Sequence, residues 1–387
     1  MNNNVVFLDC TNGYGYNYSA CNTKIEFMAR GLTKCGDICY VHNGLEGKPG
    51  LSKTEYYYRD GVGHIINYPL KWHWLISSIK NYSQLIKDLR QIRKNDRNNI
   101  VILEAPYLPI YVLQVLAARK AEYKIVVISH EWMATFNHKN IFRRWLEKSY
   151  SLFFGYMADG ILPISEYIIK KIKRFNKPYL KVPVEGDFSK LPLITDKEKY
   201  FLYCGSAGYA RVISLVIDGF VEFIKNNTEF CNSFFKLVLV LSGADWEIEV
   251  IKRMITEKKI VNYVDIEQKV PYNDLIMMYS RAAGLIIPLD PKCEQDKARF
   301  SQKIAEYLSS GTVIISNPVG EIPLYFESGK NMLLCDYTVD GFSNSFEWIA
   351  KHPGEAQQIG FAGFAVGKVF FDYVIQGKSL HNFFKGL

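Results

Sequence analysis

The chain has 387 residues, enough for two or three domains, and its 48% hydrophobic and 22% charged residues are ordinary for a globular protein with a sizeable core. No run of about 18 apolar residues predicts a membrane-spanning helix, and residues 1–10 lack the basic and apolar regions of a signal peptide. The net charge of +8 is uneven: residues 1–190 hold 27 Lys and Arg against 16 Asp and Glu, whereas residues 191–387 hold 20 against 23. This asymmetry predicts two halves with different partners.

Apolar runs of strand length alternate with longer amphipathic stretches, which predicts an α/β protein with parallel sheets. In the first half the predicted strands are 5–10, 37–42, 63–68, 99–104, 124–129, 160–164 and 180–184. In the second half they are 200–205, 235–243, 263–267, 284–289, 312–316 and 332–335.

A Gly- and Pro-containing polar segment at 186–198 separates the two halves and is the predicted linker. We therefore expect one domain at 1–190 and a second at 197–365. A helical segment at 366–387 is expected to pack back on the first domain. Since ligands of such sheets bind beyond the carboxyl ends of the strands, the expected site uses loops from both halves.

The first predicted turn carries Gly13 and Gly15, directly after strand 5–10. This turn does not match the dinucleotide-binding fingerprint, because the third glycine is missing and no acidic residue ends the second strand. NAD is therefore not an expected cofactor. A plain tight turn is the alternative interpretation.

A basic stretch at 71–97 carries seven Lys and Arg against two Asp, with Trp72 and Trp74 at its start. A basic amphipathic helix with interfacial Trp residues suits an anionic membrane surface. The alternative is a helix that packs on the core and leaves a basic face in solvent. No recognised nucleic-acid-binding motif accompanies the charge, so we expect no nucleic-acid partner.

His130 directly follows the predicted strand 124–129, at the edge of the sheet where ligands bind. A lone His is more often structural, and that is the alternative here. Ser165, after the next strand, is the predicted N-cap of a helix.

In the second half, strand 200–205 runs into a loop of small residues with Gly205 and Gly208, which permit close approach of a ligand to the backbone. Arg211 follows six residues after Gly205. A tight turn with a surface Arg is the alternative.

The segment that most clearly predicts a binding site is 282–321, where a buried strand, a polar loop, a helix and another strand follow one another. We expect the helix to begin near Ser301 as N-cap, so that its free N–H groups and the charge of Lys303 favour a diphosphate. Glu306 could then accept hydrogen bonds from a ribose diol. The alternative is an ordinary surface pair of Lys303 and Glu306 at i, i+3.

The order Lys303, Glu306-Tyr307-Leu308, Gly311 and a Val/Ile-rich strand, followed by 317–334, resembles the donor-binding region of family 4 (group 1) bacterial glycosyltransferases. The resemblance implies the GT-B fold, in which two Rossmann-like domains face a central cleft. It further implies a retaining, metal-independent reaction in which a nucleotide-diphosphate sugar is a co-substrate and no cofactor is used.

The resemblance also implies roles for individual residues. The implied catalytic residues, which hold the donor diphosphate and ribose or contact the sugar, are His130, Arg211, Lys303 and Glu306. The other implied donor-binding residues are Gly13, Gly15, Gly205, Ser206, Val270, Ser301 and Gly320. There are two departures from the family pattern: Ala298 stands where many members carry a first Glu, and Ser206 stands where an Arg is common.

The expected function is transfer of a sugar to a glycan or lipid-linked glycan acceptor in bacterial surface polysaccharide biosynthesis, such as capsule or O-antigen. The eight cysteines form no CxxC pair and have no His at zinc spacing, so we expect reduced thiols, no metal and a cytoplasmic protein, peripheral at the inner membrane face. The alternatives are a non-catalytic nucleotide-sugar-binding or membrane scaffold, and a GT-B enzyme of another reaction such as an epimerase.

Overall fold

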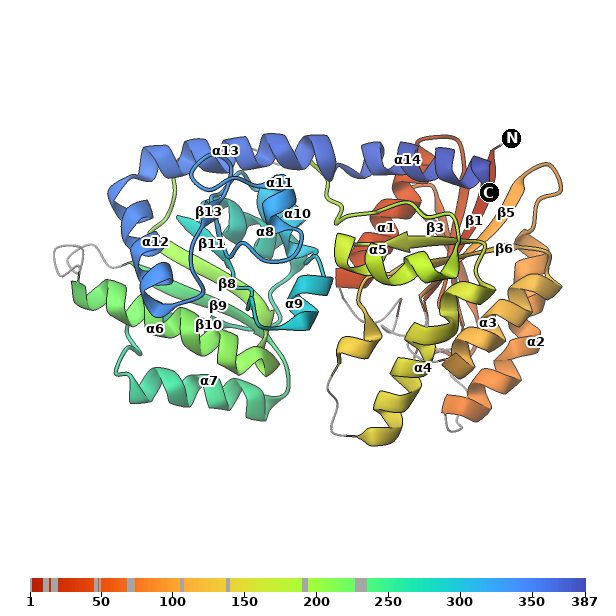
Figure 1. The fold of residues 1–387 in the computed structure, drawn as a ribbon, viewed down its shortest axis with the longest axis horizontal. Helices are drawn as coiled ribbons and strands as arrows, with labels where there is room; N and C mark the ends of the chain where they lie inside the picture. Colours follow the sequence, from red (N-terminus) through yellow and green to blue (C-terminus); the bar gives the residue numbers. More distant parts are fainter. Residues whose placement is uncertain are drawn as a thin grey trace. The chain divides into compact units, whose positions relative to one another are not determined.

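A computed structural model describes residues 2–9, 14, 20–44, 48, 50–67, 74–104, 108–136, 140–189, 194–226 and 235–387. The chain forms two compact units (Figure 1). The first comprises Met1–Gly186, Ala298–Gln302 and Phe370–Leu387, and the second comprises Asp187–Lys297 and Lys303–Val369.

The first unit is built on a seven-stranded sheet of order β3-β4-β2-β1-β5-β6-β7, parallel except for the pairing of β3 with β4. Its central strands are continuous Val/Ile/Leu runs buried on both faces, as parallel strands covered by helices require. The strands are β1 (Asn3–Asp9), β2 (Ile38–His42), β3 (Glu55–Arg59), β4 (Val62–Ile66), β5 (Asn98–Glu104), β6 (Lys124–Ser129) and β7 (Gly160–Pro163).

Helices cover both faces of this sheet (Figure 1). They are α1 (Ala20–Thr33), α2 (Trp74–Ile92), α3 (Leu108–Lys120), α4 (Ile141–Met157), α5 (Glu166–Ile172) and α14 (Tyr373–Gly386), with 3-10 turns η1 (Met133–Thr135) and η2 (Lys173–Phe175). Ser165 accepts a hydrogen bond from the amide of Ile168 and caps α5, which confirms the predicted N-cap.

The C-terminal helix α14 packs against α1 at a close approach between two glycines. A Cβ atom at Gly377 would lie 2.3 Å from the Gly31 carbonyl carbon, so only glycine fits there. Leu380 and Phe384 of α14 are buried in the same hydrophobic core as the first sheet. The last residues of the chain therefore belong to the first unit.

The second unit is built on a parallel six-stranded sheet of order β10-β9-β8-β11-β12-β13. The strands are β8 (Tyr200–Ser206), β9 (Lys236–Ser242), β10 (Val264–Glu267), β11 (Gly284–Ile287), β12 (Ile314–Ser316) and β13 (Leu333–Leu334). The chain first builds outward from β8 to β10 and then crosses to β11 on the other side of β8. Right-handed crossovers therefore put the helices of the two halves on opposite faces.

In Figure 1, α6 and α7 lie on one face of this sheet and α8 and α10 on the other. The helices are α6 (Ala210–Asn226), α7 (Asp245–Glu257), α8 (Tyr272–Arg281), α9 (Glu294–Ala298), α10 (Lys303–Ser309), α11 (Ile322–Tyr325), α12 (Val339–Lys351) and α13 (Pro353–Phe370), with the 3-10 turn η3 (Ala207–Tyr209). No helix in the described ranges is long and apolar enough to cross a membrane.

Two strand predictions differ from the structure. Residues 180–184 are not a strand: the amides of Leu180 and Val182 donate to β7, but the bridge recorded there is isolated and pairs Ile161 with Tyr179, just before the segment. Pro183 has no amide proton to extend the pairing. Strand β3 was not predicted, although Asp60 and Gly61, with φ of 52° and 80°, form the Asp-Gly turn that is typical of a hairpin.

Candidate functional site

The carboxyl edge of the second sheet gathers most of the predicted donor-binding residues. Because β8 and β11 are neighbours while the chain leaves them toward opposite faces, this edge has the topological switch point at which doubly wound sheets bind ligands. Gly205 and Ser206 end β8, Gly320 follows β12, and Lys303 and Glu306 lie on the helix between β11 and β12.

Arg211 lies in the first turn of α6 and pairs with Asp290, in the loop after β11. The hydrogen bond from Arg211 to this buried carboxylate raises the pKa of the arginine. The Arg211 side chain is nevertheless 67% exposed. The pair therefore fixes the guanidinium beside the switch point while leaving most of it accessible to a ligand.

Asp290 is itself held in place by its neighbours. Its carboxylate accepts a hydrogen bond of 2.9 Å from the Lys292 amide, and its own amide donates one of 2.9 Å to Asp296. The carboxylates of Asp290 and Asp296 thus stabilise the loop after β11 by accepting hydrogen bonds from its own amides. Sequence analysis did not identify Asp290 as the partner of Arg211, because the two residues are 79 positions apart in the chain.

The helix that carries Lys303 starts later than predicted. It runs from Lys303 to Ser309, so Ser301 is two residues outside it and does not occupy the position directly before the first turn. That position is Gln302, whose side-chain amide bonds to both the backbone N–H and the carbonyl of Glu185 and holds the chain in a non-helical path. With seven residues, this helix has only a small dipole, so the charge of Lys303 carries most of its attraction for an anion.

Glu306 is buried, with 6% of its surface exposed, and the alternative of an ordinary surface pair with Lys303 is therefore wrong. Both residues lie close to the end of β8. Burial raises the pKa of the Cys204 thiol, while Lys303 lowers it and Glu306 raises it. The Tyr307 hydroxyl also accepts a hydrogen bond of 3.1 Å from the Cys204 amide, which ties α10 to β8.

Glycines and strained backbone shape the other loops of this edge. A Cβ at Gly205 would lie 2.3 Å from the Tyr203 hydroxyl, so a larger residue there would displace that side chain, and Gly320 has φ of +61°, a conformation that favours glycine. Val270 follows Lys269, a non-glycine residue with φ of 54°, in the turn between β10 and α8. Such strain in a non-glycine residue clusters at ligand sites. It marks the turn that contains the predicted donor-binding residue Val270.

The position at which the resemblance implies a first Glu is filled by Ala298, and the two nearby acids have other partners. Ala298 is buried, and its carbonyl accepts a hydrogen bond of 2.5 Å from Ser165. Asp296 is committed to the Asp290 amide, and Glu294 pairs at 2.8 Å with Lys297 on the surface of α9.

His130 lies in a buried polar cluster at the carboxyl edge of the first sheet. Its Nδ1 is 2.9 Å from a carboxylate oxygen of Glu104, which ends the adjacent strand β5. Burial raises the pKa of Glu104, but the charges of His130 and Lys24 and two hydrogen bonds bring it below its ordinary value. An ionised carboxylate only accepts, so Nδ1 carries the proton. Burial lowers the pKa of His130, which leaves a neutral ring whose Nε2 can accept a hydrogen bond.

Two further ionisable groups complete this cluster, and sequence analysis identified neither. Burial lowers the pKa of Lys24 to about 8, and its ammonium donates to the Val182 carbonyl at 3.0 Å. Burial raises the pKa of Glu185 to about 8, so this residue is a neutral acid at pH 7. Among the described residues, no hydrogen-bond partner reaches His130 Nε2 or either carboxyl oxygen of Glu185. The cluster therefore offers buried polar atoms to a ligand.

Within the described ranges, the same cluster has a group of potential metal ligands. One donor atom each from Cys21, Glu104 and His130 lies within 4.8 Å of the others. The ammonium of Lys24 acts on the same Glu104 carboxylate and opposes a second cation. A metal-independent reaction remains our prediction.

Other predicted features of the first unit are only partly described. Gly13 and Gly15 lie outside the described residues. Of the basic stretch, α2 spans Trp74–Ile92, and its apolar residues Leu85, Leu89 and Ile92 are buried. In residues 81–92, where the side chains are described, this packing matches the alternative of a helix that packs on the core.

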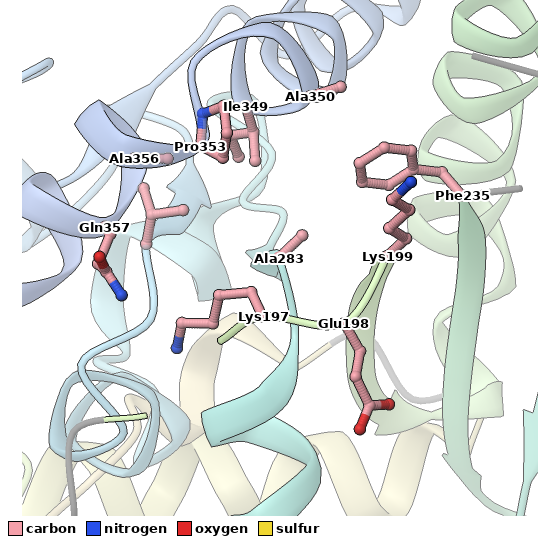
Figure 2. A pocket seen from close by; sticks show the side chains of 11 residues that line it. Lys197, Glu198, Lys199, Phe235, Ala283, Ile349, Ala350, Pro353, Ala356 and Gln357 are labelled. Atoms are coloured by element: carbon pink, nitrogen blue, oxygen red, sulfur yellow. The ribbon is translucent and has the colours of Figure 1, made fainter. Parts of the chain in front are cut away.

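A cavity of about 220 Å³ lies in the second unit, away from the predicted donor residues (Figure 2). Its walls include Lys199, Phe235, Ala283 and Val313, which stand at or just before the amino ends of four strands. Lys197 also lines it and donates at 2.6 and 2.7 Å to Ser280 and Thr312. Because the cavity is at the amino edge of the sheet, it is not the site that the switch point predicts.

Comparison with solved structures identifies the fold. Sucrose-phosphate synthase from Thermosynechococcus elongatus superposes with a TM-score of 0.70 at 13% identity, covering 100% of this chain and 99% of its own. Trehalose-phosphate synthase from Burkholderia xenovorans, in complex with glucose-6-phosphate, gives 0.71 at 9% identity, with 99% and 100% covered. HepE from Anabaena, in complex with UDP-glucose, gives 0.69 at 11% identity, with 99% and 100% covered. The predicted α/β class with two Rossmann-like units, the GT-B fold, is confirmed.

No protein-family model matches the chain, and no curated protein sequence matches it. At 9–13% identity, these structural similarities establish the fold.

The protonation of Glu185 predicts a specific pH dependence of stability. Its pKa in the folded protein is about 8, above the usual value of 4.5, so the folded state binds more protons than the unfolded state between these values. This contribution to stability is complete below pH 4.5 and is lost as the pH rises through 8. We expect Glu185→Gln to gain on the order of 2 kcal/mol relative to wild type between pH 5 and pH 8. Urea unfolding of both proteins at several pH values measures this, and a difference that stays constant with pH would contradict it.

Proposed function

We propose that the protein is a glycosyltransferase that transfers a sugar from a nucleotide-diphosphate sugar. The observation that carries this proposal is the convergence of Arg211, Lys303 and Glu306 on the switch point of the second sheet. One exposed guanidinium, one ammonium and one buried carboxylate match a diphosphate and a ribose diol. The GT-B fold supports the proposal, since the solved structures that share it include synthases and a protein bound to UDP-glucose.

In this mechanism the cations act on the leaving group. Arg211, fixed by Asp290, and Lys303 offset the negative charge that develops on the nucleoside diphosphate as the glycosidic bond breaks. Lys303 begins α10, and we assign its ammonium to a phosphate oxygen. Glu306 accepts from the ribose hydroxyls, and the backbone at Val270 contacts the base.

The polar cluster of the first unit provides hydrogen-bonding groups of another kind. His130 Nε2 accepts from a sugar or acceptor hydroxyl while Glu104 holds the other ring nitrogen. Glu185, as a neutral acid, can both donate and accept. We assign these residues to binding and orientation and assign no protein nucleophile. The proposed reaction retains the anomeric configuration and uses no metal, as family 4 enzymes do.

The proposed acceptor is a glycan or lipid-linked glycan in bacterial surface polysaccharide synthesis, such as capsule or O-antigen. A second candidate is a sugar phosphate, because one similar structure holds glucose-6-phosphate and the names of two refer to sugar-phosphate products. The absent first Glu at Ala298 favours a third candidate, a scaffold that binds the donor without transferring its sugar.

Nucleotide binding tests the donor site. We expect one of UDP, GDP, ADP and dTDP to raise the Tm, and Arg211→Ala to weaken its Kd roughly 10- to 100-fold, the equivalent of about 1.5–3 kcal/mol for a charged hydrogen bond. Isothermal titration calorimetry measures the Kd.

The matched control is Arg281→Ala. Arg281 is also half exposed and paired with a carboxylate, Glu198, but it lies at the amino ends of the strands. Equal losses in the two variants, or stabilisation by NAD alone, would rule out the proposed donor site.

Turnover tests the acceptor. With the nucleotide sugar that binds best, we expect release of nucleoside diphosphate to be at least tenfold faster with a synthetic polyprenyl-diphosphate-linked sugar than with glucose-6-phosphate, and to be unchanged by EDTA. A faster reaction with glucose-6-phosphate would replace the proposed acceptor. Loss of activity in EDTA would contradict metal independence, and tight donor binding without any turnover would favour the scaffold.

A further inference from the structure

Helix α4 of the first unit exposes an unusual set of large apolar side chains. Phe142 is 67% exposed and Trp145 61%, and their rings stack with centroids 6.1 Å apart. Ile141, Leu152, Phe153 and Tyr156 of the same helix are also exposed. Single exposed apolar residues are normal, but a contiguous group on one helix marks an interaction surface.

These side chains form one stripe. A helix advances about 100° per residue, so positions 141, 145, 152 and 156 lie close to one line, with 142 and 153 beside it. The opposite face of α4 packs on the first unit through Tyr150, Ser151, Phe154 and Gly155, which are buried. Helix α4 is therefore apolar on both sides, and only one side is covered by the described residues. We call the exposed side the α4 stripe.

The charges beside the α4 stripe are positive. On α4 itself, Lys148 is exposed and Arg144 is half-buried, both next to the stripe on the helix surface. The only acidic residue of the helix, Glu147, is buried and paired with Arg143 at 2.9 Å. The helix therefore presents apolar and basic groups without an exposed carboxylate.

A second group of basic residues is attached to the same helix. The ring of Phe175, at the end of η2, packs against Tyr156 at 5.0 Å and against Phe154 at 5.1 Å. The preceding residues of α5 and η2 carry exposed Lys170, Lys171 and Lys173. The aromatic stripe and this lysine group thus belong to one packed part of the first unit, whose half of the chain holds the positive excess.

We propose that the α4 stripe docks on an anionic lipid surface, with its aromatic and aliphatic side chains in the interfacial region and the neighbouring Lys and Arg residues at the headgroups. Aromatic and aliphatic groups flanked by Lys and Arg are the composition that binds such an interface, where burial of apolar area and attraction to anionic lipid add together. A lipid surface is favoured over a protein partner because the exposed charges of α4 itself all have one sign. The proposal places docking on α4, whereas Leu85, Leu89 and Ile92 of the 71–97 stretch are buried in the core.

Vesicle cosedimentation tests the proposal with no donor or acceptor present, so its failure is separate from failure of the proposed function. The probes are phosphatidylcholine vesicles with and without 30% phosphatidylglycerol, a composition chosen within the physiological range of anionic lipid. We expect the full-length protein to bind the anionic vesicles and Phe142→Ser/Trp145→Ser to bind them at least tenfold more weakly. Both side chains are largely exposed, so circular dichroism and the Tm of the variant should match those of wild type.

Trp246→Ser is the matched control, because Trp246 on α7 is 69% exposed but lies outside the α4 stripe. We expect this variant to bind like wild type. Reversal of charge in Arg144→Glu/Lys148→Glu, or salt at about 0.5 M, should also weaken binding severalfold, since anionic headgroups are screened.

Three results would overturn the proposal. Equal binding by wild type and Phe142→Ser/Trp145→Ser would show that another surface contacts lipid. Equal binding to neutral and anionic vesicles would show that the basic residues do not contribute to docking. Absence of vesicle binding, together with a dimer that the double variant converts to a monomer in analytical ultracentrifugation, would assign the stripe to a second copy of the chain.

Discussion

The parallel pairing of β8 with β11 is the constraint on which the proposed donor site depends. These strands are more than 75 residues apart in sequence, yet their pairing brings Gly205 and the loop carrying Asp290 to one edge. Asp290 in turn positions Arg211, and the Tyr307 hydroxyl ties α10, with Lys303 and Glu306, to the end of β8. Without this pairing the charged groups would remain scattered along the chain.

The polar groups assigned to ligand binding in the first unit are buried, whereas the Arg211 guanidinium of the second unit is exposed. Arg211 is fixed at one side and open to solvent, which suits a highly charged diphosphate. His130, Glu104, Lys24 and Glu185 are instead withdrawn from water. Burial disfavours charge and shifts the pKa values of His130, Lys24 and Glu185, whereas neighbouring charges and hydrogen bonds hold the pKa of Glu104 below its ordinary value. A low-dielectric site strengthens directional hydrogen bonds, which suits neutral sugar hydroxyls. The two edges therefore differ in the ligand chemistry that they favour.

Sequence patterns predicted the sheets well because buried parallel strands are continuous apolar runs between turns. They predicted Arg211, Lys303 and Glu306 as a group because the chain keeps a characteristic spacing there. Glu104 could have been found from the sequence, because it is an acidic residue that ends a buried strand next to the strand of His130. Lys24 and Glu185 could not, because nothing in the local sequence marks a charged residue as buried. The start of α10 was misplaced because Gln302 bonds to Glu185, 117 positions away. The exposed face of α4 also escaped prediction, because apolar residues on both sides of a helix are typical of an interior one.

A crystal structure of the protein with the nucleoside diphosphate that raises its Tm most tests the central claim directly. The account predicts phosphate oxygens within hydrogen-bond distance of the Arg211 guanidinium and the Lys303 ammonium, beyond the carboxyl ends of β8 and β11, with the ribose at Glu306. A nucleotide bound instead in the cavity beside Lys197, at the amino ends of the same strands, or at the His130 cluster of the first unit, would contradict it.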